Sequence, residues 1–160
     1  MKKAILICLL SLMVKAGFTQ KTEWLFGLSP DSAQLLATDI AGMQQAGYSF
    51  EKQENYTTNF GIHVFAFTFK SEQVKEPFDV YFQAFQIDGK PRLFLEQIEG
   101  DFDAMFSFWS KYIDGKANPE EAKKKRFNKR SHQNPIRKEK WVSCILSGDR
   151  KVWSVLVRVE

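Results

Sequence analysis

A change from helical spacing to strict two-residue alternation constrains the fold of this chain more than any other feature. The alternation predicts four strands, at Tyr48–Thr58, Ile62–Lys70, Phe78–Ile87 and Leu93–Ile98. The pair Asp88-Gly89 separates the last two strands and is typical of a two-residue hairpin turn, which needs positive φ at both central positions. We therefore expect a four-stranded antiparallel meander.

Helical spacing flanks this meander on both sides. Ser29 has the place of an N-cap, Pro30 that of the first helical residue, and Asp31 lies near the positive end of the helix that follows. This first helix is expected to continue as far as Gly47. A second, more aromatic helix is predicted from Asp101 to Gly115, with one apolar face made of Phe102, Met105, Phe106, Trp109 and Ile113.

The rest of the chain predicts a basic arm over residues 116–140 and a closing hairpin. Asn118-Pro119 resembles a further helix start, but few apolar residues follow it, so we expect an exposed helix that frays into a mobile loop after Asn128. Lys140–Leu146 and Val152–Val159 have the pattern of two paired strands. The predicted fold class is α+β, with an N-terminal helix, the meander, a second helix, the arm and a C-terminal β-hairpin.

The first 19 residues have the layout of a cleaved secretion signal. Lys2 and Lys3 precede an eleven-residue apolar run from Ala4 to Val14, and cleavage is expected after Ala16 or Thr19. The run is too short for a transmembrane helix, which needs about 20 apolar residues. We therefore predict an exported protein, periplasmic or extracellular, whose mature form is one domain over residues 20–160 without a transmembrane segment.

Positive charge is concentrated in the arm. Residues 111–140 hold eleven Lys and Arg against four Asp and Glu, a formal charge of +7, whereas the rest of the predicted mature chain carries −6. The predicted anion-binding residues are Lys123, Lys124, Lys125, Arg126, Phe127, Lys129 and Arg130. Cations around an aromatic wedge suit an anionic surface or an anionic protein, and export argues against nucleic acid. The alternative is a charged loop that is merely solvated.

The predicted strands are apolar on both faces, which a sheet covered on one side does not require. One interpretation is that the face turned away from the helices lines an apolar cavity or a partner surface. A small apolar ligand would then be carried by Phe65, Phe67 and Phe82. The other is that the first helix covers one face of the sheet and the second helix covers the other. The sequence leaves both open.

Few residues suit catalysis. After export Cys144 is the one thiol, with His63 or His132 as its base, but Cys144 lies in an apolar strand where cysteine is usually a buried hydrophobe. A carboxylate cluster stands where acidic residues also cap a helix; its members are Glu96, Glu99, Asp101 and Asp103. We therefore predict a non-enzymatic binding protein without metal or cofactor, with a carrier of an apolar ligand or a small hydrolase as alternatives.

Overall fold

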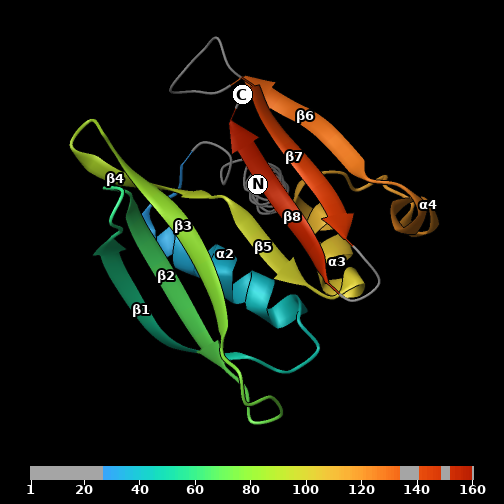
Figure 1. Ribbon diagram of the computed structural model, residues 1–160, viewed down its shortest axis with the longest axis horizontal. Helices are drawn as coiled ribbons and strands as arrows, with labels where there is room; N and C mark the ends of the chain where they lie inside the picture. Colours follow the sequence, from blue (N-terminus) through green and yellow to red (C-terminus); the bar gives the residue numbers. More distant parts are fainter. Residues whose placement is uncertain (1–26, 134–140, 149–151, 160) are drawn as a thin grey trace, which may run out of the picture.

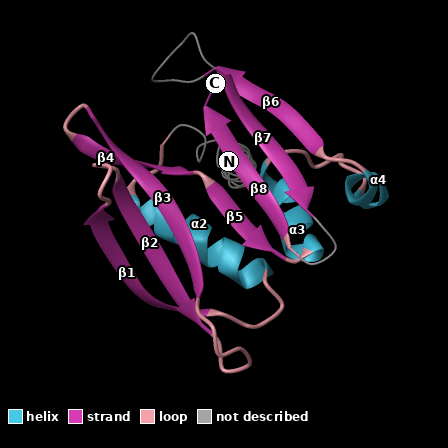
Figure 2. Cartoon of the chain, viewed as in Figure 1, coloured by secondary structure: helices cyan, strands magenta, loops and turns pink. Residues whose placement is uncertain are grey.

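The computed structural model describes residues 27–133, 141–148 and 152–159, which form two antiparallel sheets with two helices, α2 and α3, on one side of them (Figure 1). Sheet A has the strand order β1-β2-β3-β4, with bounds Ser49–Thr57, His63–Lys70, Phe78–Ile87 and Lys90–Leu95. Sheet B has the order β5-β8-β7-β6, with bounds Gln97–Gly100, Trp153–Val159, Trp141–Gly148 and Phe127–Gln133. The helices are α2 (Pro30–Met43), α3 (Phe102–Tyr112) and α4 (Pro119–Lys124) (Figure 2). The α+β class, the meander and the closing hairpin are confirmed.

Helix α2 begins where the sequence predicts. The Ser32 N–H donates to Ser29 Oγ at 3.2 Å, and Pro30 is the first helical residue. The buried side of the helix consists of Ala33, Leu36, Ala37, Ile40 and Ala41, which pack in one core cluster with sheet A and α3. The β3–β4 turn also has the predicted form, since φ is +51° at Asp88 and +72° at Gly89.

The fourth strand of the predicted meander is two strands in different sheets. β4 ends at Leu95 and β5 starts at Gln97, and between them the Glu96 carbonyl accepts a hydrogen bond from the Val157 N–H at 2.7 Å. This bond directs the chain toward β8, so β5 joins sheet B and α3 packs on sheet B. The expectation that two helices cover the two faces of one sheet is therefore wrong. Helix α2 covers one face of sheet A, and no helix among the described residues covers the other.

The arm is more ordered than the sequence suggests. After α4 the chain forms β6, which pairs antiparallel with β7 and sets Phe127 opposite Leu146. The expected mobile loop is therefore wrong for residues 127–133, because β7 satisfies the backbone of a segment that lacks apolar periodicity. Residues 134–140 of the arm lie outside the described residues.

The predicted secretion signal, residues 1–19, also lies outside the described residues. Over the part of the chain that the structure describes, no helix is both long and apolar enough to cross a membrane.

Candidate functional site

The basic segment, by which we mean residues 123–130, is held in place by its own helix. Asn118 caps α4, since its Oδ1 accepts from the N–H groups of Glu120 at 2.9 Å and Glu121 at 3.3 Å. Ala122 is buried and belongs to the core cluster. The cations that follow are therefore attached to a fixed support.

Two of these cations already have partners. Lys123 lies 3.7 Å from Glu120 and 4.8 Å from the centre of the Phe102 ring, and Lys125 lies 3.2 Å from Glu121. All of these charged side chains are exposed, and exposed ion pairs contribute little to stability. Lys123 and Lys125 can therefore exchange their partners for a stronger anion.

Lys124 and Arg126 differ from their neighbours. Both are exposed, and neither has an ion-pair partner among the described residues. Among the cations at positions 123–126, whose side chains the structure describes, these two are the most available to an anion. Lys129 and Arg130 follow on β6, opposite Cys144 and Ser143 of β7, at the outer edge of sheet B.

Phe127 is not the exposed wedge that the sequence suggested. It is half-buried and packs against the core, with its ring centre 6.0 Å from that of Trp109. Its role in the structure is to anchor β6 to α3. A partner that binds the basic segment would therefore contact the cations but not the Phe127 ring.

The phenylalanines predicted to hold an apolar ligand lie in the core. Phe67 and Phe82 are fully buried, and their rings meet edge to face at 5.6 Å. Phe65 is half-buried and packs against the same cluster. All three belong to the α2 side of sheet A, because the register sets Phe65 opposite Phe82 and Phe67 opposite the buried Val80.

The residues considered for catalysis are not brought together. Cys144 is fully buried in sheet B, whereas His63 starts β2 in sheet A, where its Nδ1 lies 2.8 Å from Thr57 Oγ1. Asp101 caps α3 by accepting from the Ala104 N–H at 2.8 Å, and Asp103 lies in the first turn of that helix. No three metal-ligating side chains are grouped within the described residues.

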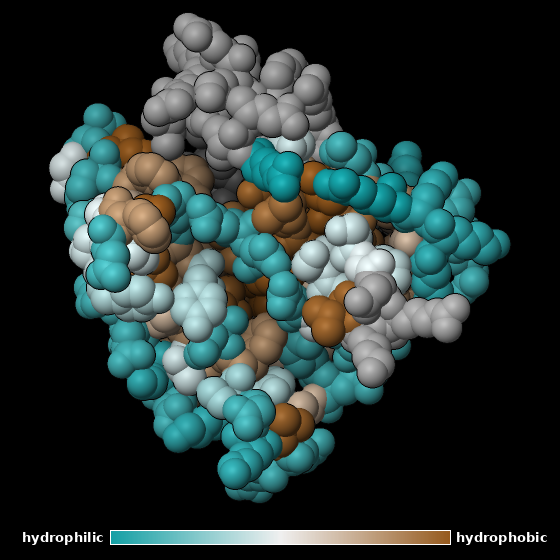
Figure 3. Space-filling view, in the orientation of Figure 1, coloured by the Kyte–Doolittle hydropathy of each residue, from teal (hydrophilic) through white to brown (hydrophobic). Residues whose placement is uncertain are grey.

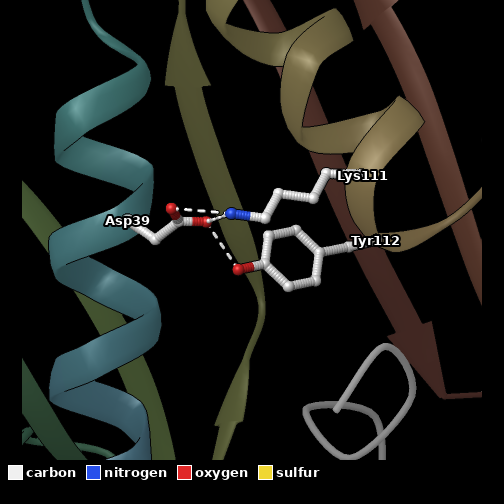
Figure 4. Close-up of polar contacts among 3 residues, drawn as sticks. All are labelled: Asp39, Lys111 and Tyr112. Atoms are coloured by element: carbon white, nitrogen blue, oxygen red, sulfur yellow. Dashed lines mark hydrogen bonds and ion pairs between the residues drawn. The ribbon is translucent and has the colours of Figure 1, made fainter. Parts of the chain in front are cut away.

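A polar cluster that the sequence did not reveal joins α2 to α3 (Figure 4). Lys111 Nζ lies 2.8 Å from both carboxylate oxygens of Asp39, and the Tyr112 hydroxyl donates to Asp39 Oδ2 at 2.5 Å. Burial, together with the hydrogen bond to Asp39, raises the pKa of Tyr112 above its usual range. Because one carboxylate receives all these bonds, the cluster serves to connect the helices of the two sheets.

This cluster makes the protein sensitive to alkaline pH. Above about pH 10 an unfolded tyrosine loses its proton, while folded Tyr112 retains it, so the free energy of unfolding falls as the pH rises. We expect Tyr112→Phe to cost about 1 kcal/mol at pH 7 and to make the decline above pH 10 shallower. Urea unfolding followed by circular dichroism between pH 7 and 11 measures both effects. An equally steep decline in the variant would contradict this account.

A second surface lies on the helix-free face of sheet A, opposite the face that holds Phe65, Phe67 and Phe82. Tyr56, Tyr81 and Phe85 each expose nearly half of their surface there, and Phe60 is almost fully exposed in the β1–β2 turn. The two-residue alternation of the sequence includes Tyr56, Tyr81 and Phe85. It did not indicate which face of sheet A helix α2 would leave uncovered.

Comparisons of the chain with protein-family models, with curated proteins and with solved structures find no match. The fold defines an α+β protein of two antiparallel sheets with α2 and α3 on one side. Its surface carries two features suited to binding, the basic segment at the edge of sheet B and the aromatic side chains at one end of sheet A.

Proposed function

We propose that this is a non-enzymatic binding protein whose basic segment docks on an anionic partner. The observation that best supports this is the position of the cations at the end of helix α4, in the two-residue link after it and on edge strand β6, with Lys124 and Arg126 exposed and unpaired within the described chain. A fixed array of cations loses less conformational entropy on binding than a loop would. The partner is rich in phosphate, sulfate or carboxylate groups, which Lys and Arg attract and hydrogen-bond.

Export is part of the same proposal. The predicted signal would deliver the protein to the periplasm or beyond the cell, where anionic glycans, lipids and proteins are the available partners. The charged edge of β6 has a second consequence in that setting, since Lys and Arg on an edge strand oppose pairing with the strands of other molecules.

Heparin, a soluble polyanion, provides the test. We expect the protein to bind heparin with an affinity that falls as salt rises. Lys124→Gln/Arg126→Gln should reduce the slope of log affinity against log salt by about two, near one for each cation removed. Titrations at several salt concentrations give these slopes. The matched control is Lys70→Gln/Lys75→Gln, which removes the same charge from sheet A and its adjoining loop.

Two results would contradict the proposal. One is an absence of salt-dependent binding in the unmodified protein. The other is an equal decrease of affinity in both double variants, because that would mean that heparin responds to net charge alone. Unchanged thermal unfolding midpoints would establish that each variant is folded.

A further inference from the structure

The β1–β2 turn presents Phe60, the most exposed large apolar side chain of the described residues, at 91%. The turn is not frayed. The Gly61 N–H donates to the Thr58 carbonyl at 2.9 Å, and the Thr58 N–H donates to the Ile62 carbonyl at 2.8 Å. Gly61 has φ of +75°, which a glycine adopts without strain. The exposure of Phe60 is therefore built into a well-bonded turn.

Further exposed apolar side chains lie on the helix-free face of sheet A, at the end of the sheet where the β1–β2 turn carries Phe60. The register sets Ala84 opposite His63, which brings Phe85 level with Ile62, and Tyr56 stands opposite Val64 in the next row. Tyr56, Phe85 and Ile62 are exposed by 48%, 46% and 38%. Figure 3 shows hydrophobic side chains gathered over the end of sheet A where the β3–β4 turn lies. We call this surface, with Phe60 at its apex, the hairpin tip.

The charges around the hairpin tip are mainly positive. Arg92 stands opposite Phe85, and Lys90 stands opposite Ile87. Both cations are exposed, and neither has an ion-pair partner in the described chain. The nearest acidic residue in sequence is Asp88, in the β3–β4 turn.

The acidic residues on the same face of sheet A lie farther from the turns and are already engaged. Glu54 pairs with Lys52 at 3.0 Å, and Asp79 accepts from the Tyr81 hydroxyl at 3.1 Å. Polarity therefore changes along the sheet, from an ion pair and a hydrogen-bonded carboxylate in one part to apolar groups and unpaired cations at the other end.

We infer that the hairpin tip docks on a lipid bilayer that contains anionic lipids. A projecting phenylalanine needs a soft apolar partner, and the acyl region below the headgroups is one. Tyr56 lies one row behind, where a ring with a polar end suits the headgroup level. Lys90 and Arg92 would then meet lipid phosphates. This inference goes beyond the proposed function because it uses a different surface from the basic segment.

The first test places a reporter at the apex. We expect the added fluorescence of Phe60→Trp, relative to the unmodified chain, to shift to shorter wavelength with vesicles of phosphatidylcholine and phosphatidylglycerol, and to be quenched by brominated acyl chains. Leu35→Trp is the matched control, since Leu35 is 72% exposed on α2, the helix that covers the opposite face of sheet A. Quenching at Phe60→Trp without quenching at Leu35→Trp supports docking through the tip. Absence of quenching at Phe60→Trp overturns it.

The second test measures the contribution of each group to vesicle cosedimentation. Phe60→Ser should lower the partition coefficient about tenfold, as expected for one phenyl ring withdrawn from an apolar phase, whereas Leu35→Ser should not change it. Lys90→Gln/Arg92→Gln should weaken binding only when phosphatidylglycerol is present. Equal binding by Phe60→Ser and the unmodified protein would overturn the inference, as would equal decreases in the two serine variants.

One further variant distinguishes membrane docking through the hairpin tip from binding through the basic segment. Lys124→Gln/Arg126→Gln should retain the quenching of a tryptophan at position 60, even where it no longer binds heparin. Disappearance of that quenching would mean that the basic segment, and not the hairpin tip, holds the protein on vesicles.

Discussion

Phe67→Ala is expected to lower the free energy of unfolding by about 3–5 kcal/mol, the cost of removing a large aromatic side chain from a well-packed core. Phe67 is fully buried on the α2 side of sheet A, where its ring meets that of Phe82. A helix on one side and a strand on each flank leave little freedom for the site to collapse around the cavity. Urea unfolding followed by circular dichroism measures the decrease.

Phe60→Ala is the matched control, because it makes the same chemical change on the same hairpin. Its ring is 91% exposed, so we expect a change within about 0.5 kcal/mol. A similar cost for both variants would mean that the two faces of sheet A have been assigned wrongly. A small cost for Phe67→Ala would mean that Phe67 is not buried in the core. It would then favour the apolar ligand surface that was considered from the sequence.

The contrast between Phe60 and Phe67 shows what local sequence can predict. Helix starts and tight turns depend on a few consecutive residues, so the sequence predicts them correctly. The examples are the helix starts at Ser29 and Asn118 and the turn at Asp88-Gly89. Alternation also assigns residues to the two faces of a strand. Which face a helix will cover depends on contacts between distant segments, and alternation carries no information about those.

The division into two sheets depends on one such distant contact. The hydrogen bond from the Val157 N–H to the Glu96 carbonyl joins residues far apart in the sequence. No sequence pattern around Glu96 predicts this bond. β6 was missed for a related reason. An edge strand rich in cations has no apolar alternation, and its pairing with β7 becomes visible only in the assembled sheet.

The candidate sites follow the same division. The sequence located the cations of the basic segment, because charge density is a local property. It did not predict that Glu120 pairs with Lys123 or that Phe127 packs near Trp109. The hairpin tip was harder still, because its exposed residues are of the same chemical type as those in the core.

Cys144 is expected to react with iodoacetamide at least about a thousandfold more slowly in the folded protein than in urea, since its side chain is fully buried and reaction requires an opening that costs several kcal/mol. A chain with Cys8→Ser and Glu72→Cys carries a second, exposed thiol at position 72 in addition to Cys144. Peptide mapping by mass spectrometry then follows both reaction rates in one sample. The exposed thiol should react at the same rate in both conditions. Alkylation of folded Cys144 as fast as the exposed thiol would contradict the buried position. It would also favour the hypothesis, considered from the sequence, that Cys144 is a catalytic nucleophile, because only an accessible thiolate can attack a substrate.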